Sequence, residues 1–439
     1  MPEKRGRGSP ELVPNPFIKK RNLEWSIELT GLAHDAEDSS SSLSSLSPSP
    51  PAQADEPKTS AVEAGEAKVD DHLAYFCGIL AKATLAPFPN GMPQLPVTNY
   101  RELYDAHFGK REGAHFVIHQ HDHPIAGTHY DLRLQINETS SASWAIMYGL
   151  PGDPNSQRLN RNATETRVHC LWNHLVETAS TSTGSLLIWD TGTYTVLQRR
   201  SKYAPAEDPD SQPSAPGASP QLTEQEKLNQ AFKARKIRLE LNGSRLPRNY
   251  VLSLRLTKSE DAAGRAKIGR KPKTRRRRGG AKTKAPEPMT SSDSDSDRNT
   301  GKAGVGGEED IVHAPAEVDQ EGVSAMEREI RELEDEEVRK TNAYTGATNT
   351  IGSVHQRKWY LSLDREACGF VKRRKQGKVI WECVEEHEDV GDARLRFPFH
   401  VKGAEVERSV VTGRQGAEVL KDEGVVDFVA RKGWRPVLN

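Results

Sequence analysis

Long tracts that are poor in apolar residues limit which parts of this 439-residue chain can fold. Residues 39–57 are a run of serine and proline, and residues 261–350 hold a basic block, a Ser/Asp repeat and an acidic stretch. Such segments bury too little apolar surface to offset the entropy that ordering a chain costs. We therefore expect disorder over residues 1–70 and 261–350, with a further short linker at residues 205–220.

The segments outside these tracts contain short alternating strands and few helices. KIRLELNGSRLPRNYVLSLRL, at residues 236–256, predicts two strands joined at Asn242-Gly243, a frequent hairpin turn. Near the C-terminus, KWYLSLD and VIWECVEE are strand-like, and residues 417–430 are helix-like. The pattern predicts a mainly β fold.

Composition and cysteine spacing indicate the compartment. The four cysteines show no close pairing, so they favour reduced thiols over a disulfide or zinc framework. The N-terminus has charge and proline where a signal peptide needs an apolar core. The longest apolar stretch, residues 73–85, is too short to cross a bilayer. We expect a soluble intracellular protein that does not bind membranes.

A histidine-rich stretch at residues 115–134, HFVIHQHDHPIAGTHYDLRL, holds five of the chain's 14 histidines beside two aspartates and an arginine. Its last part continues as THYDLRLQI, which alternates with period two, as in a half-buried strand. His129, Asp131 and Arg133 then share one face. The opposite face is apolar and is predicted to enter the core.

The residues just before this strand are predicted to complete a metal site. FVIHQH is also strand-like, and DHPIAGT carries a proline and a glycine for a turn. If the two strands pair as a hairpin, His121 comes close to His129 and Asp131. Two neutral imidazoles and a carboxylate form a ligand set for a divalent cation. Arg133, on the same face, can bind a phosphate through both of its terminal nitrogens.

The order of motifs over residues 115–256 resembles the 3′-phosphoesterase domain of bacterial DNA ligase D. HFVIHQH…THYDLRL is similar to that family's strand ending in histidine, followed by a His-Tyr-Asp-x-Arg-Leu strand. Ser-Trp-Ala at 143–145, the turn at 149–151, SLLIWDTGTY at 185–194 and the strands at 236–256 resemble its later motifs in the same order.

This resemblance implies a small β-barrel with flanking helices over residues 71–260. Residues 351–439 are then a C-terminal α+β extension, which we expect to pack on the barrel. The family removes phosphates and single ribonucleotides from the 3′ end of a primer and uses Mn²⁺. The resemblance therefore implies that Mn²⁺, or another divalent metal, is held by His121, His129 and Asp131.

The resemblance also implies a set of residues that contact the phosphate. Arg133 would be one of them. His174 is the candidate for a histidine that contacts the phosphate oxygens, with His169 as the alternative. Arg158 and Arg167 compete for the place of an upstream arginine in the site.

Three positions depart from the family pattern. His119 stands where the family has glutamine, Tyr148 where it has lysine, and Thr178 in the place of a tyrosine. These changes leave open a second reading, a non-catalytic DNA-repair or chromatin adaptor with a metal-stabilised barrel. A third is a non-haem iron oxygenase, in which His174 would join two of the ligands above as a 2-His-1-carboxylate triad.

The function we rank first is a metal-dependent, end-healing phosphoesterase that removes a 3′-phosphate or 3′-terminal ribonucleotide from DNA. Its substrate partners would be DNA 3′ ends, in a primer–template or nicked duplex. The chain lacks a ligase's Lys-x-Asp-Gly motif, so it would prepare these ends for other DNA-repair proteins, which are further expected partners. A basic block predicts nuclear import, hence a nuclear protein, and phosphate binding. It consists of Arg270, Lys271, Lys273, Arg275, Arg276, Arg277 and Arg278.

Overall fold

The computed structural model describes residues 57–198, 222–268, 336–383 and 393–438. The basic block, the linker at 205–220 and most of the N-terminal tract lie outside these residues, so their predicted disorder and roles stay predictions. No helix of the described residues is both long and apolar enough to cross a membrane.

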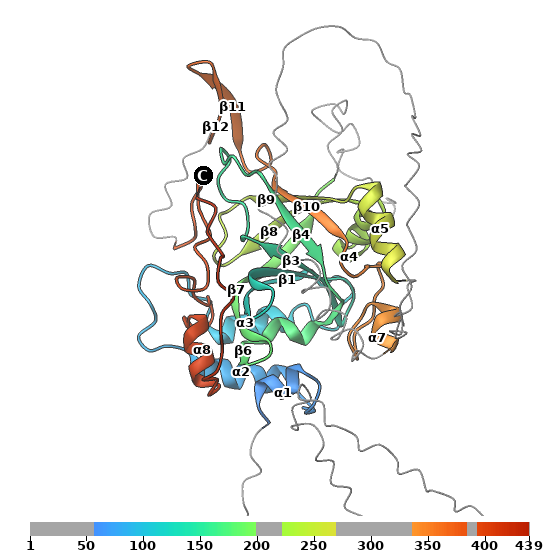
Figure 1. Cartoon of the computed structure of the whole chain (residues 1–439), viewed down its shortest axis with the longest axis vertical. Coiled ribbons are helices and arrows are strands. Elements are labelled where there is room, and N and C mark those ends of the chain that lie inside the picture. Colours follow the sequence, from blue (N-terminus) through green and yellow to red (C-terminus); the bar gives the residue numbers. More distant parts are fainter. Residues whose placement is uncertain (1–56, 199–221, 269–335, 384–392, 439) are drawn as a thin grey trace, which may run out of the picture. The chain divides into compact units, whose positions relative to one another are not determined.

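Eight antiparallel strands close into a ring in the order β1-β2-β3-β4-β10-β9-β8-β7, and β7 pairs with β1 (Figure 1). They are β1 (His115–His123), β2 (Gly127–Gln135), β3 (Ser140–Met147), β4 (Asn160–Glu165), β7 (Gly184–Val196), β8 (Lys236–Gly243), β9 (Tyr250–Arg255) and β10 (Lys358–Leu363). Two short strands extend the sheet, β5 (His169–Cys170) beside β3 and β6 (Thr178–Ser180) beside β7. Closure leaves these eight strands without a free edge. The predicted mainly β barrel is confirmed.

The main core fills the inside of the ring. It contains Tyr130 and Leu132 of β2, which belong to the face of THYDLRLQI that the sequence predicts to be buried. Three tryptophans, Trp144, Trp189 and Trp359, are fully buried in the same core. Because strand residues alternate, the histidines of β1 and β2 lie on the outer face of the barrel.

A helical layer covers that outer face. It comprises α1 (Thr59–Glu63), α2 (His72–Ala83), α3 (Val97–Asp105) and the 3₁₀ helix η2 (Leu171–Leu175). Phe76 of α2 and Tyr100 of α3 pack with Val117 of β1 and Ile188 of β7 in a second core. α8 (Gly416–Asp422), shorter than the helix-like residues 417–430, contacts β6 and β7. The helical layer therefore packs on the face of the barrel that carries the histidines, and His121 stays partly exposed.

One strand of the ring comes from the C-terminal part of the chain. β10 lies between β4 and β9. The buried Arg357 guanidinium lies 2.6 Å from the Glu165 carboxylate at the end of β4, and the Trp359 indole nitrogen donates to that carboxylate. Beyond it, β11 (Phe370–Lys375) and β12 (Lys378–Cys383) form a separate two-stranded sheet. The C-terminal segment thus contributes a strand of the barrel itself.

The predicted hairpin turn at Asn242-Gly243 is wrong. Both residues belong to β8 and pair with β7, and the chain turns at residues 244–249. The buried Asp190 carboxylate accepts backbone N–H bonds from residues 244, 245 and 246, which moves the turn. The sequence pattern could not show this carboxylate beneath the loop.

Order also extends into tracts that we assigned to disorder. α1 lies within residues 1–70, and α5 (Lys258–Ile268) and α7 (Glu336–Thr341) lie at the two ends of 261–350. Asp261 of α5 is paired with Arg357, 2.8 Å away, so this charged helix is held by a contact distant in sequence. α4 (Glu224–Lys233), which follows the linker, begins with a capping box at Thr223 and Glu226.

Candidate active site

The antiparallel pairing of β1 with β2 brings the predicted metal ligands together. His121 lies opposite His129, and His119 lies opposite Asp131. One ligand atom each of His121, His129 and Asp131 lies within 4.8 Å of the other two. This is the one group of three or more such residues in the described part of the chain that can hold a metal ion. His121 is partly exposed, whereas the other two are buried.

Backbone carbonyls fix the protonation pattern of both imidazoles. Nε2 of His121 lies 2.8 Å from the Thr183 carbonyl oxygen, and Nδ1 of His129 lies 2.8 Å from that of Gly127. Because a carbonyl can only accept, these two nitrogens carry the hydrogens. The remaining nitrogens, Nδ1 of His121 and Nε2 of His129, each lie 3.5 Å from an Asp131 oxygen. Burial lowers the pKa of His121, but its hydrogen bond to Asp131 and the Asp131 charge raise that pKa overall, so the ring must lose a proton before Nδ1 can bind a metal. The two ring nitrogens and the carboxylate converge as in a metal site whose outer hydrogen bonds orient the ligands.

Neighbouring charges keep the Asp131 carboxylate ionised. Burial alone would raise its pKa, but His129, His121 and Arg133 hold the pKa of Asp131 well below its usual range. Burial lowers the pKa of His129, and the Asp131 charge opposes this effect. An ionised carboxylate beside imidazoles that release their extra protons is the donor chemistry that a divalent cation requires.

Buried polar atoms without a hydrogen-bond partner among the described residues surround the Arg133 side chain. They are Nε and Nη1 of Arg133, both ring nitrogens of His119, Nδ1 of His169, Nε2 of His174, and the hydroxyls of Ser141 and Ser143. The strand pairing gathers several of them, since Arg133 lies opposite Ser143, and Ser141 lies opposite His169. Buried donors normally find an acceptor, because an unpaired one costs about 1–3 kcal/mol. This group fits an oxyanion with several acceptor oxygens.

His174 is held by a second buried histidine. The two Nδ1 atoms of His174 and His115 lie 2.7 Å apart, and the Tyr100 hydroxyl donates to the His174 carbonyl. One of these Nδ1 atoms must carry the hydrogen. Burial, His115 and Arg133 hold the pKa of His174 well below its usual range, so the ring is neutral. His115 was not among the predicted site residues, although it belongs to the histidine-rich stretch.

Glu63 is a second residue that the sequence did not indicate. It ends α1, within residues predicted to be disordered, and its carboxylate is close enough to Arg133, His121 and Asp131 to interact with their charges. Burial raises the pKa of Glu63, while Arg133 and His121 lower it. The pattern EAGEAK around it gives no signal, because only the packing of α1 beside β6 brings this helix to the site.

The two candidate arginines occupy different surroundings. Arg158 is exposed in the segment before β4, whereas Arg167 is buried and donates to the Val338 carbonyl of α7. Their roles in the site stay predictions. Burial lowers the pKa of both His169 and His174, and the Arg133 charge lowers both further. Both histidines therefore lie near the Arg133 guanidinium.

This arrangement has a counterpart among known protein families. Residues 119–254 match the DNA Ligase D 3′-phosphoesterase domain. The match runs from β1 through β9 and contains the three candidate metal ligands, Arg133, and both candidate histidines. It confirms the resemblance in the sequence and supports a phosphoesterase. β10 and the C-terminal segment lie beyond it, and no curated protein matches the chain.

Proposed function

We propose that this protein is a metal-dependent phosphoesterase that removes a 3′-phosphate, or a 3′-terminal ribonucleotide, from DNA and leaves a 3′-hydroxyl. The observation that supports it most is the position of the unpaired buried donors around Arg133, directly beside the His121–His129–Asp131 group. The metal ligand set and the oxyanion pocket lie next to each other. Together they match a phosphate ester better than either feature would alone. The oxygenase reading loses support, because His174 is paired with His115 and is not part of the ligand group.

The three ligands would hold Mn²⁺ or another divalent ion through Nδ1 of His121, Nε2 of His129 and the carboxylate of Asp131. When bound, such an ion polarises a phosphoryl oxygen and lowers the pKa of a bound water. Arg133 lies 3.7 Å from Asp131, so its remaining N–H groups can bind phosphate oxygens and stabilise the charge that develops on them. No nucleophilic serine, cysteine or lysine is needed in this scheme.

His174 and His169 would bind the phosphate as neutral rings. The Thr191 hydroxyl donates to the Phe116 carbonyl, so it can only accept from Nε2 of His115. Nδ1 of His115 then accepts from Nδ1 of His174, and Nε2 of His174 keeps a lone pair that can accept a hydrogen bond from a phosphate hydroxyl. His119, which stands where the family has glutamine, lies opposite Asp131 and adds a further neutral imidazole. We propose that His119 replaces the contact that the glutamine makes in the family.

The test uses a primer–template with a 3′-phosphate, or one 3′-terminal ribonucleotide, and pure protein with Mn²⁺. We expect a 3′-hydroxyl product from the wild type, and none above the metal-free level from Asp131→Ala. Asp105→Asn, which changes an exposed carboxylate at the end of α3, is the matched control and should retain activity. Mn²⁺ binding is measured in parallel by calorimetry.

Equal turnover by Asp131→Ala and the wild type would contradict the proposed site. Tight Mn²⁺ binding by the wild type with no turnover on either substrate would instead favour the non-catalytic adaptor.

A further inference from the structure

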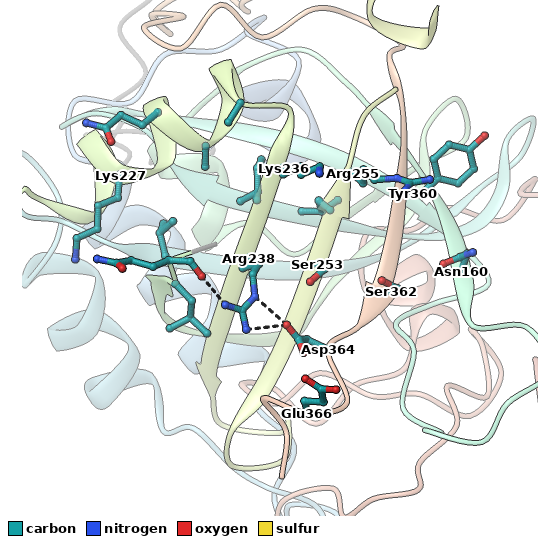
Figure 2. A pocket seen from close by; sticks show the side chains of 18 of the residues that line it. Asn160, Lys227, Lys236, Arg238, Ser253, Arg255, Tyr360, Ser362, Asp364 and Glu366 are labelled. Carbon is teal, nitrogen blue, oxygen red and sulfur yellow. Dashed lines mark hydrogen bonds and ion pairs between the residues drawn. The ribbon is translucent and has the colours of Figure 1, made fainter. Parts of the chain in front are cut away.

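A groove with a volume of about 1330 Å³ lies on the outer face of β8, β9 and β10 (Figure 2). In the ring of strands, β9 is four places from β2, so this groove faces away from the candidate metal ligands. Its wall comes from α4 and from Leu197 and Leu222. The match to the family ends inside β9, so the third strand of the floor, β10, lies outside it.

The groove floor carries a row of large side chains in register across three strands. Lys236 of β8 lies opposite Arg255 of β9, and Arg255 lies opposite Tyr360 of β10. Figure 2 shows these three labelled side chains side by side along one end of the groove. Tyr360 is 38% exposed, so its ring is open to a ligand.

Two like charges face each other in this row. Neither Lys236 nor Arg255 forms an ion pair with a described residue, and both are exposed. Like charges directly opposite on antiparallel strands destabilise a sheet. Lys358, two residues before Tyr360 and also exposed, adds a third cation to the same face. An anionic ligand would relieve this repulsion.

The other end of the groove is compensated and serves the fold. Arg238 lies 2.8 Å from the Asp364 carboxylate, and Glu366 lies beside this pair (Figure 2). The groove therefore has one cationic end with an exposed aromatic ring, and one end where a single cation faces two carboxylates. A ligand would place its negative charge at the Lys236–Arg255 end.

Cations around an exposed ring on a sheet fit a chain that carries both phosphates and planar bases. Bases stack on aromatic side chains, and Lys and Arg follow the phosphates. In a duplex the bases are already stacked, so their faces are not open to Tyr360. We propose that this groove binds single-stranded DNA, with a base on the Tyr360 ring and phosphates at Lys236 and Arg255. This contact goes beyond the proposed activity, because it uses another face of the barrel and needs no metal.

The experiment measures fluorescence anisotropy of a labelled oligo(dT) with the full chain in the absence of metal. We expect Tyr360→Ala to lower the affinity about tenfold and Tyr360→Phe to retain it, because stacking needs the ring and not the hydroxyl. Replacing both cations (Lys236→Gln with Arg255→Gln) should reduce the slope of log K against log salt by about 1.4, which is the contribution of two phosphate contacts to a single strand. Lys110→Gln, an exposed lysine outside the groove, is the matched control.

An abasic oligonucleotide distinguishes binding in the groove, which needs a base, from binding of phosphates alone by the basic block at residues 270–284. The wild type should prefer oligo(dT) to the abasic strand, and Tyr360→Ala should lose that preference. Unchanged oligo(dT) affinity in both Tyr360→Ala and the double cation variant would overturn the proposal. That result is expected if the groove binds a peptide and not DNA. Asp131→Ala should bind oligo(dT) like the wild type, so a failure of the proposed activity would leave this result standing.

Discussion

At the scale of single residues, the chemistry of the site depends on groups that never contact a substrate. The Thr183 and Gly127 carbonyls decide which nitrogens of His121 and His129 face Asp131. Each carbonyl accepts one ring hydrogen, and the opposite nitrogen of each ring is the one that faces Asp131. The sequence can name the imidazoles as ligands. It cannot say which nitrogen of each ring is free.

His115 allows a prediction about pH. Burial lowers the pKa of His115 to about 3, so the folded protein keeps this ring neutral where an unfolded chain would protonate it. Above pH 6.5 the ring is neutral in both states and has no effect. As the pH falls from 6.5 towards 3, only the unfolded state gains the proton, and stability is lost.

The predicted measurement is urea unfolding of the wild type and His115→Gln. Between pH 7.5 and 5 the wild type should lose about 2 kcal/mol of unfolding free energy through His115, and the variant should lack this part of the loss. Equal losses in both proteins would mean that His115 is protonated, or solvated, in the folded chain.

At the scale of elements, β10 decides whether the barrel closes. Without it, β4 and β9 would present free edges, and the buried Trp359 and Leu361 would leave the core. The Glu165 carboxylate fixes this strand, since it accepts from Arg357, Trp359 and Ser353. Arg357 in turn reaches Asp261 of α5. In addition to its pairing with β4 and β9, β10 is therefore anchored by a buried network of charges around Arg357.

We predict that Arg357→Met destabilises the protein by about 3–5 kcal/mol, because it leaves the Glu165 charge buried and unpaired. Combining it with Glu165→Gln removes that charge and should restore part of the loss. Urea unfolding of the two variants checks this. A double variant no more stable than Arg357→Met would show that geometry, and not the unpaired charge, causes the effect.

At the scale of the whole molecule, the chain combines a folded body with long charged tracts. The closed barrel carries the candidate metal ligands on one side and the groove on the other. The basic block at residues 270–284 connects β9 and β10 in sequence and lies outside the described residues. A tract between two barrel strands can be long without opening the ring, since the cost of closing a loop grows slowly with its length.

We propose that the protein is nuclear and that residues 270–284 import it. Deleting them should then move the protein out of the nucleus and lower its affinity for DNA at modest salt, while the barrel stays folded. Fluorescence microscopy of the tagged chain and anisotropy at two salt concentrations measure the two effects. A nuclear protein after the deletion would remove the role of this block in import. Replacing Asp293, Asp295 and Asp297 by Asn is the control for a change of charge in the same tract.

The sequence by itself determined the local features of this protein. Period-two alternation placed His129, Asp131 and Arg133 on one face of β2, and the Pro/Gly turn brought His121 opposite His129. The order of motifs indicated the family and its barrel. These features follow from neighbours in the chain, because strand alternation and a short hairpin involve residues close in sequence.

Only the tertiary structure decided which distant segments complete the fold and the site. Glu63 and His115 reach the site through packing of the helical layer, β10 enters the ring across a long tract, and Asp190 moves the turn away from Asn242-Gly243. Each depends on contacts between residues far apart in sequence. Such contacts are specified by burial and geometry in three dimensions, and no local pattern of one strand or turn carries them.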